Sequence, residues 1–493
     1  MRLFTTIGQI LATERKALQH VQASLSETQR RLAHLRAEVS GLERHEEALR
    51  LRAAAATGIC GDLVLRFMRE FFDTIPDDVL LLIFEEVVSA SEGWGEEGMH
   101  FDKDLAQAPF RLAAVCQRWR HLAVSYPILW TYLALPEYDD LNQAHVERIE
   151  NLLCRSQQAP IDVFADWDCH ELIDTVGPYA EAITRLIGSL GHRLRLFSWS
   201  SLNVSTDAAF EGLRGPTPHL TQLYIDPASE VRRSSLEVFL PFAPRIEVIQ
   251  WYSEYSVWSF AAQRYASLIT LTIGCDPPLD SVVNAMRVVR DSLQELNLGP
   301  FVSPDPFGQS VCLELPRLTT LRIWDWGWAK YLCAPALRRL ASGNSWSRDG
   351  DYFGHILRPF VTVQHLALFA PCDVVELTPL TELVNITTLE VCGTTWGKRE
   401  SCGKLSDGFF AAAVDFESPI WPKLKHIHFD NGRGFDHITP VSDTDLVTFL
   451  RLRNETPATE LEPRSTSRIE TVKLGYDAPE WLIREVERLT ALH

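Results

Sequence analysis

The stretch Leu220-Thr221-Gln222-Leu223-Tyr224-Ile225 carries the pattern that decides the fold of this chain. Its apolar side chains stand at the first, fourth and sixth positions, as expected of a short strand with one buried face. The pattern starts again at residues 194, 246, 268, 293, 318, 363, 386, 424 and 469, and in a weaker form at residue 337. From residue 194 to residue 386 the copies begin 19 to 26 residues apart.

A unit of this length is typical of a leucine-rich repeat, in which each copy adds a short parallel strand and then a loop or helix. No copy buries its apolar face alone, so neighbouring copies stack. Gaps of 38 and 45 residues before the last two copies indicate insertions. We expect an α/β chain whose array, residues 191–478, is an irregular solenoid with a curved parallel sheet. Residues 136–190 are expected to be a helical N-terminal cap with one early strand at 161–164, and residues 479–493 a C-terminal capping helix.

One face of the predicted sheet is open to a partner, because side chains alternate between the two faces of a strand. Aromatic and charged residues gather there, as at many protein interfaces. The residues expected to bind a protein target are Tyr224, Tyr252, Arg322, Trp324, Trp326, Trp328 and Phe369. An ordinary solvated sheet face competes with this interpretation for the charged residues. For the three tryptophans between 324 and 328, the alternative is packing against neighbouring loops, including Trp346.

The first 57 residues predict one long helix with a coiled-coil seam. When Phe4 is position a of a seven-residue period, apolar residues fill the a and d positions up to Leu49, except at Glu14, Thr28 and Glu46. A seam of this period predicts a left-handed supercoil. It is too narrow and too exposed to be stable alone. Either a second copy pairs with it as a homodimer, or it packs against the rest of the chain. Residues 58–74 are expected to be a linker.

Charge separates this helix from the body of the chain. The helix carries a net charge of +3 and the whole chain -18, so the body carries -21. An acidic body argues against nucleic acid as the main partner, and no apolar run is long enough to expect a membrane partner. The chain has ten scattered cysteines and no CxxC pair or signal-peptide pattern. We therefore expect reduced thiols and a cytoplasmic and/or nuclear location.

A segment of a third kind lies between the helix and the array. It reads Ile75-Pro76-Asp77-Asp78-Val79-Leu80-Leu81-Leu82-Ile83-Phe84, then Val115-Cys116-Gln117-Arg118-Trp119, then Pro127-Ile128-Leu129-Trp130. Pro76 suits the first turn of a helix, and Asp77 and Asp78 suit its positive end. A second helix is expected at residues 110–123. The residues between the two helices, 89–108, are rich in Gly, Glu and Ser and predict an acidic loop insertion.

These three sub-motifs, in this order, resemble an F-box. Together with the preceding coiled coil, they resemble fungal F-box proteins with degenerate C-terminal leucine-rich repeats. The resemblance implies that residues 75–135 bind the Skp-type adaptor of a cullin-RING ubiquitin ligase, and through it a cullin. The positions that match the family's adaptor-binding pattern are Ile75, Pro76, Val79, Leu80, Ile83, Phe84, Leu112, Val115, Cys116, Trp119 and Leu129. Some of these must be internal core. The family's usual connection is shorter than residues 89–108.

Enzyme chemistry is not expected. The sequence has no phosphate-binding loop, HExxH, GxSxG or kinase set, and no nucleophile with a base at hand. His426 and His428 share one strand face with Asp430, but we expect no metal site and no cofactor. The expected function is that of a substrate receptor of an SCF-type ubiquitin ligase. The alternative is a coiled-coil and repeat scaffold for protein interactions that acts outside any ligase.

Overall fold

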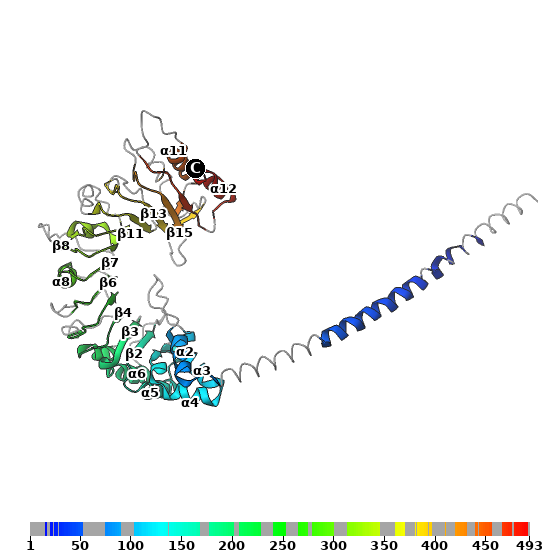
Figure 1. The fold of residues 1–493 in the computed structure, drawn as a ribbon, viewed down its shortest axis with the longest axis horizontal. Helices are drawn as coiled ribbons and strands as arrows, with labels where there is room; N and C mark the ends of the chain where they lie inside the picture. Colours follow the sequence, from blue (N-terminus) through cyan, green and yellow to red (C-terminus); the bar gives the residue numbers. More distant parts are fainter. Residues whose placement is uncertain are drawn as a thin grey trace, which may run out of the picture. The chain divides into compact units, whose positions relative to one another are not determined.

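The structure of the 493-residue chain is a computed structural model (Figure 1). It describes residues 15–16, 20–22, 24–27, 29–52, 74–89, 103–136, 138–167, 177–201, 207–227, 240–252, 265–274, 279–299, 313–345, 360–369, 380, 382–392, 394–396, 410, 420–430, 439–441, 443–455, 466–475 and 478–491. The chain divides into two units, Met1–Leu82 and Ile83–His493, which are described separately. Within the described residues, no helix has both the length and the apolar character needed to cross a membrane.

The first unit contains the long helix, which covers the described residues between 15 and 52. This segment has no proline, and its Ala, Glu, Arg, Gln and Leu residues favour a helix. Its apolar seam side chains are exposed: Val21, Leu25, Leu32, Leu35, Val39, Leu42 and Leu49. The predicted N-terminal helix is therefore confirmed over these residues. Residues 58–73 of the predicted linker lie outside the described part of the chain.

Helix α2 (Asp77–Ser89) begins directly after Pro76, with two aspartates in its first turn. Acidic side chains there stabilise the positive end of the helix. The loop predicted at 89–108 is shorter than expected, because Ser89 still belongs to α2 and the next helix, α3, begins at Lys103. Residues 90–102 lie outside the described residues.

The helix predicted at 110–123 is two helices, α3 (Lys103–Val115) and α4 (Gln117–Ser125). The break is at Cys116, whose backbone is extended, with φ -156° and ψ 174°. The Cys116 Sγ accepts a hydrogen bond from the Trp119 N–H at 3.4 Å and caps α4. A short 3₁₀ helix, η1 (Pro127–Trp130), follows. The conformation of one residue thus redirects the chain between two helices.

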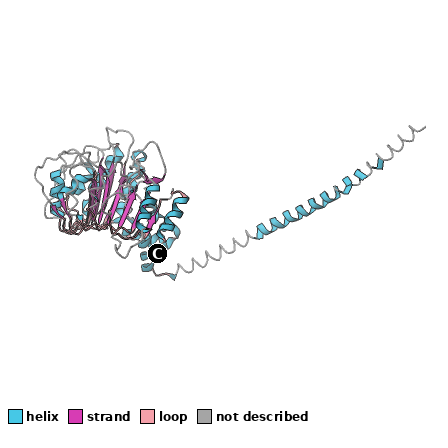
Figure 2. Cartoon of the chain, turned by 90° about the horizontal axis from the view of Figure 1, so that it is seen from above, coloured by secondary structure: helices cyan, strands magenta, loops and turns pink. Residues whose placement is uncertain are grey.

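A parallel sheet of 13 strands forms the frame of the second unit. The strands follow one another in chain order: β1 (Tyr132–Ala134), β2 (Ile161–Asp166), β3 (Leu194–Ser201), β4 (Gln222–Pro227), β5 (Val248–Trp251), β6 (Thr270–Ile273), β7 (Glu295–Leu298), β9 (Thr320–Asp325), β11 (Arg339–Ser345), β12 (His365–Phe369), β13 (Thr388–Cys392), β15 (His426–Asp430) and β17 (Thr471–Lys473). They lie side by side in one layer that follows a curve from β2 to β15 (Figures 1 and 2).

Smaller elements lie beside this sheet. Among the described residues, two short parallel pairs are β8 (Leu313–Glu314) with β10 (Leu332–Cys333), and β14 (Thr394–Trp396) with β16 (Thr439–Val441). Helix α8 (Leu279–Val289) lies on the outer side of the curve of strands (Figure 1).

The register of the large sheet follows the six-residue pattern. From β4 onward, every strand of this sheet begins at the third position of a copy, and these third positions pair, as Gln222 with Val248 does. In the copies that begin between residues 220 and 424, the first, fourth and sixth positions are buried, as at Leu220, Leu223 and Ile225. A shift of one residue would move the buried set to the other face, so the pattern fixes the register. The strands predicted in the array are confirmed at these positions.

The predicted helical cap contains the one strand that was expected in it. Residues 136–190 hold α5 (Gln143–Ser156) and α6 (Pro178–Gly188), and they also hold β2, which pairs with β1 on one side and β3 on the other. The strand expected at 161–164 is confirmed as part of β2, which belongs to the large sheet. This sheet begins with β1, and β1 precedes the region that was expected to cap the sheet. Ile161 and Val163 are fully buried in this strand, because it has sheet neighbours on both edges.

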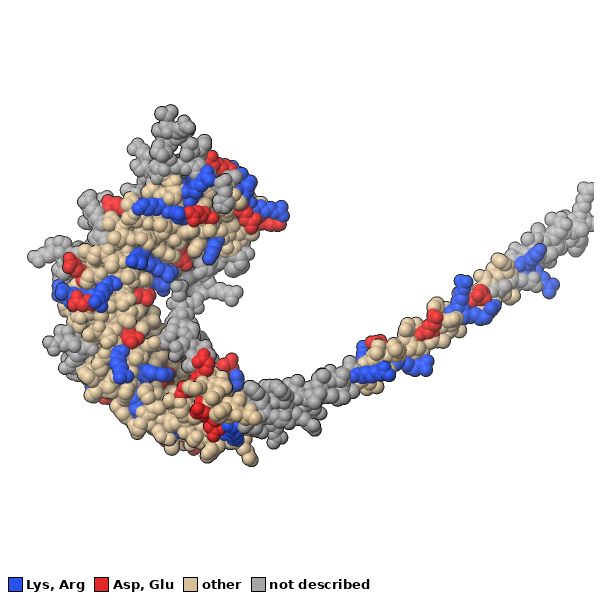
Figure 3. All heavy atoms as spheres, in the orientation of Figure 1, with Lys and Arg blue, Asp and Glu red and all other residues tan. Residues whose placement is uncertain are grey.

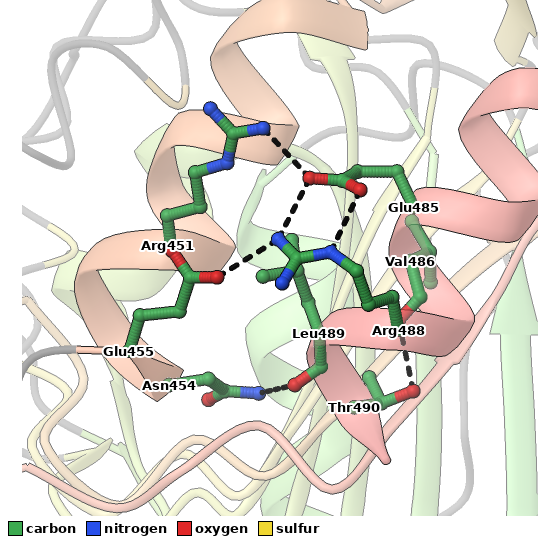
Figure 4. Close-up of polar contacts among 8 residues, drawn as sticks. All are labelled: Arg451, Asn454, Glu455, Glu485, Val486, Arg488, Leu489 and Thr490. Carbon is green, nitrogen blue, oxygen red and sulfur yellow. Dashed lines mark hydrogen bonds and ion pairs between the residues drawn. The ribbon is translucent and has the colours of Figure 1, made fainter. Parts of the chain in front are cut away.

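Two helices pack together near the end of the chain, α11 (Asp443–Asn454) and α12 (Glu480–Thr490). Arg488 on α12 binds Glu485 at 2.9 Å and also Glu455, the residue that follows α11, at 2.8 Å (Figure 4). The Asn454 side-chain amide donates to the carbonyl of Leu489 at 3.0 Å. The helix predicted at 479–493 is confirmed and is attached to α11 by these polar contacts.

Candidate functional site

Helix α2 presents apolar side chains to solvent along one face. Val79, Ile83 and Val87 are four residues apart and therefore lie on the same face. Their side chains are 41%, 39% and 46% exposed, and the neighbouring Leu82 is 64% exposed. Apolar side chains grouped in this way are characteristic of a surface that a partner covers. We call Val79, Leu82, Ile83 and Val87 the α2 face.

The second-unit part of α2 is held from its other side by aromatic packing. Phe84 is fully buried, and its ring centroid lies 4.8 Å from that of Trp119 on α4. The Tyr126 hydroxyl, just before η1, donates a hydrogen bond to the Glu85 carboxylate. This hydrogen bond, with smaller contributions from burial and from the charge of Glu85, raises the pKa of Tyr126 to about 12. These contacts fix the direction in which Ile83 and Val87 point.

Trp130 ties η1 to the helices around it. Its indole Nε1 donates a hydrogen bond to the Ala123 carbonyl at 2.7 Å, and the side chain is 1% exposed. The Phe110 ring stands edge-on to it, with centroids 5.2 Å apart. The Arg155 guanidinium of α5 lies 4.4 Å over the ring, a cation–π distance. Through Trp130, the predicted Pro127–Trp130 cluster therefore contacts α3, α4 and α5.

The predicted adaptor-binding residues separate into core and surface. Leu80, Phe84, Leu112 and Leu129 are buried, so they are core positions. Exposed or partly exposed are Ile75, Pro76, Val79, Ile83, Val115, Cys116 and Trp119. The sequence left this division open, because helical periodicity shows which face is apolar but not what covers it.

Further exposed apolar side chains of this segment were missing from the predicted set. Val87, Phe110, Val124 and Ile128 are 46%, 37%, 43% and 48% exposed. For Val87 the sequence held the signal, because it continues the spacing of Val79 and Ile83. The exposure of Phe110 and Ile128 depends on how α3 and η1 pack, which the sequence does not reveal.

The predicted target-binding residues lie at several places along the sheet. Tyr224 on β4 and Tyr252 after β5 are partly exposed, with ring centroids 5.4 Å apart. Burial raises the pKa of Tyr224, and the charge of Asp226 acts in the same direction. On β9, Arg322 is partly exposed and Trp324 is 38% exposed. The side chains of Trp326 and Phe369 lie outside the described residues.

Trp328 is not on this face. Strand β9 ends at Asp325, and Trp326–Tyr331 forms the 3₁₀ helix η6 instead of continuing the strand. Trp328 is 1% exposed, and its Nε1 donates a hydrogen bond to the Gly299 carbonyl at 3.2 Å. The expectation that Trp328 is exposed by strand alternation is therefore wrong, because a helical turn replaces the period of two. Its packing corresponds to the alternative interpretation for this residue.

A polar group that is not among the predicted site residues lies on the same face of the sheet, toward its C-terminal end. The Glu390 carboxylate on β13 accepts a hydrogen bond from Arg339 Nη2 on β11 at 3.3 Å and lies 2.9 Å from His365 Nε2 on β12. The hydrogen bond with His365 lowers the pKa of Glu390, and the charge of Arg339 adds to this effect. The signal was present, since these residues occupy third and fifth positions of the six-residue pattern.

His428 on β15 and Lys473 on β17 extend this group, in register with Glu390. We call Arg339, His365, Glu390, His428 and Lys473 the basic cluster. Burial lowers the pKa of His428, and the nearby charge of Lys473 acts in the same direction. Lys and Arg side chains gather near β11 to β15 in Figure 3. Such a surface suits an acidic partner.

In the described part of the chain, His, Cys, Asp and Glu side chains form no group of three or more that could hold a metal ion. No family model and no curated protein matches the chain. Among solved structures, the chain is similar to a protein from Bacteroides fragilis at 14% sequence identity, with a TM-score of 0.24. The match covers 44% of this chain and 67% of the Bacteroides protein.

Proposed function

We propose that the chain is the substrate receptor of an SCF-type cullin-RING ubiquitin ligase. In this proposal, residues 75–135 are an F-box that binds a Skp-type adaptor, and through it a cullin. The strands from β3 onward belong to an irregular leucine-rich-repeat solenoid that binds a protein target for ubiquitination. The chain needs no catalytic residue for this role, because holding a target near the ubiquitin-charged enzyme raises the rate by proximity. It would act in the cytoplasm or the nucleus.

The α2 face is the observation that carries the proposal. Val79, Ile83 and Val87 expose apolar surface on one side of α2. Burying a fully exposed side chain of this size gains roughly 1.5–3 kcal/mol, and these three are 39% to 46% exposed, so covering each of them gains roughly 1 kcal/mol. The partner class comes from the resemblance of Ile75–Phe84, with the two later sub-motifs, to an F-box.

Preorganisation adds to this argument. Phe84 packs on Trp119, and Glu85 accepts a hydrogen bond from Tyr126, so Ile83 is flanked in sequence by two residues that are already fixed. A surface that needs no rearrangement loses less conformational entropy on binding. The α2 face is therefore suited to a rigid groove on the partner.

The sheet face is proposed to recognise the target. Trp324 offers an exposed aromatic side chain, and the basic cluster contributes two cations, Arg339 and Lys473, of which Arg339 is paired with Glu390. An exposed tryptophan and charge complementarity are the usual sources of affinity and specificity at such surfaces. A target segment with acidic side chains fits this composition.

A binding measurement with the purified full chain and a purified Skp-type adaptor tests the proposal. Ile83→Asp is expected to weaken binding at least about 30-fold, because it places a charge in an apolar contact. Ile483→Asp on α12 is the matched control, since Ile483 is 38% exposed and Ile83 39%. Adaptor binding that is absent in the wild type, or equally weakened by both variants, refutes the proposal. Phe84→Asp is unsuitable because Phe84 is fully buried.

A protein-interaction scaffold outside any ligase is the second candidate. The exposed seam of the N-terminal helix favours it, because such a helix binds partners without an adaptor. This alternative predicts that the wild-type chain does not bind the purified adaptor and still binds partners through residues 15–52. The adaptor measurement therefore separates the two functions directly.

A further inference from the structure

The N-terminal helix exposes a continuous apolar seam. Leu25, Leu32, Leu35, Leu42 and Leu49 are 46% to 69% exposed, and they lie at a and d positions of the seven-residue period. Charged side chains of both signs follow the helix (Figure 3). A seam of this kind is stable only when another helix covers it. The charges beside the seam decide which helix fits, and in which direction.

We propose that this helix pairs with the same helix of a second copy of the chain, and that the two helices run antiparallel. The inference rests on the seam and its flanking charges, and it does not depend on the ligase proposal. In a coiled coil, a and d residues form the buried layers, and e and g residues flank them. The two possible directions bring different residues together.

A parallel pair in register is unfavourable in its buried layers. Each a residue then meets its own copy, so Glu46 would face Glu46 of the second copy inside the seam. Two carboxylates in a buried layer repel and lose hydration. The parallel arrangement therefore contains a like-charge contact in the core.

The flanks of a parallel pair are unfavourable as well. A g residue meets the e residue five positions later on the other helix. Arg31 would then face Arg36 of the second copy, and Glu38 would face Glu43. Each contact occurs twice by symmetry. All four side chains belong to the described helix.

An antiparallel pair has a register that removes these conflicts. In it, Leu25 faces Leu42 of the second copy, and Leu32 faces Leu35. Each of these four leucines then meets another leucine. Glu46 faces Val21 near the end of the pair, where water is close.

The same register pairs opposite charges at its centre. The g residue Arg31 faces Glu38 of the second copy, and by symmetry this ion pair occurs twice. At the flanks, Arg15 with Arg50 is the like-charge pair, and it lies at the ends of the overlap, where charges are most hydrated. The leucine layers and the central ion pairs therefore favour one register together.

The relative direction of the two helices decides how far apart the two chains leave the pair. With a rise of 1.5 Å per residue, the points at which the two chains leave the pair after Leu51 lie about 50 Å apart. A parallel pair would bring them side by side. An antiparallel dimer therefore suits two targets, or two sites of one assembly, that are well separated. Binding both sites at once raises the overall affinity.

Charge reversal distinguishes the two directions by the sign of the effect. In the antiparallel register, Arg31→Glu and Glu38→Arg each replace two attractive pairs with repulsive ones. Each is expected to weaken self-association of the full chain about tenfold at low salt, and the double variant restores it. In a parallel pair, each single variant would create attraction, with Arg36 or Glu43, and would tighten self-association.

Arg30→Glu is the matched control. Arg30 and Arg31 both pair with Glu27 within the helix, at 2.9 Å and 3.9 Å, but Arg30 lies on the outer side of a coiled coil. Sedimentation equilibrium of the full chain is expected to show a dimer for the wild type and for Arg30→Glu. A monomeric wild type, tighter dimers with the single variants, or equal weakening by Arg30→Glu and Arg31→Glu each overturn the proposal.

Discussion

Arg339 and Glu390 meet across an intervening strand. Arg339 Nη2 on β11 lies 3.3 Å from Glu390 Oε2 on β13, and β12 runs between the two strands. Neighbouring strands are about 4.8 Å apart, so the arginine side chain reaches over about 10 Å. The β12 residue in register with Glu390 is Ala367, whose small side chain leaves room for this reach. The small side chain of Ala367 on β12 thus permits an ion pair between residues of the two strands on either side, β11 and β13.

Glu390→Gln is expected to lower the free energy of unfolding at pH 7 by about 1–2 kcal/mol, because it removes a charged acceptor from Arg339 and His365. The pKa of Glu390 is lowered in the folded state. Its contribution is therefore present above the ordinary glutamate pKa of about 4.3 and is lost as the pH falls through the lowered value. Urea unfolding of both proteins should show their difference shrinking below about pH 4.

The control for this prediction is Glu470→Gln. Glu470 pairs with Lys425 at 2.7 Å, but its side chain is 51% exposed. Solvent screens such a pair, so the variant should unfold at nearly the same urea concentration as the wild type. An equal loss of stability in the two variants would contradict the stabilising contribution predicted for the contacts of Glu390 with Arg339 and His365.

Phe84→Ala is expected to destabilise the second unit by about 3–5 kcal/mol, because it leaves a cavity beside Trp119. Ile83→Ala, one residue earlier, should cost less than about 1 kcal/mol, since Ile83 is 39% exposed. Denaturant unfolding followed by tryptophan fluorescence measures both. Similar costs for the two variants would show that the assignment of core and surface on α2 is wrong.

Arg453→Met should cost about 2–4 kcal/mol of stability. Arg453 is 7% exposed and donates hydrogen bonds to the carbonyls of Ile420 and Trp421, at 2.6 Å and 2.8 Å. Burial lowers the pKa of Arg453 to about 10. Methionine has no hydrogen-bond donor in its side chain, so both carbonyls would lose the hydrogen bond from Arg453. Arg451→Met is the control: Arg451 pairs with Glu485 of α12 at 2.7 Å, but its side chain is 54% exposed, so solvent screens the pair and the variant should cost less than about 1 kcal/mol. Thermal unfolding compares them.

Gly191→Ala is expected to destabilise the chain by about 2 kcal/mol or more, because a Cβ at this position would collide with the backbone carbonyl of Gly212. At Gly215 the nearest atom to an added Cβ is the Gly212 carbonyl oxygen at 4.0 Å, so Gly215→Ala should be nearly neutral. Differential scanning calorimetry of the two variants tests this close approach. Equal melting temperatures would contradict it.

The elements that the sequence predicted well are those whose signal is local. The third position of each six-residue copy marks the start of a strand, as at Gln222 and Thr270. The break at Cys116 and the 3₁₀ helix after Asp325 were missed. Both depend on one or two residues whose backbone leaves the periodic conformation, and a periodic pattern does not reveal such a change.

The candidate site was predicted less well than the fold. Periodicity placed Ile83 and Phe84 on an apolar helix, but Trp119, 35 residues after Phe84, decides which of the two is covered. The same holds for Arg339 and Glu390, which are 51 residues apart in the sequence and meet only once the strands are aligned. Contacts of this range are set by the summed packing of many residues.

The sequence alone was enough to predict the long N-terminal helix and the position of each strand in the array, because alternation and helical period act within one element. The regular spacing of the copies predicted that these strands are parallel. The tertiary structure decided that Trp328 is buried, that Leu129 is core while Ile128 is exposed, and that the basic cluster forms. The physical reason is that burial and ion pairing depend on neighbours contributed by distant segments. Those neighbours exist only after the strands and helices have packed.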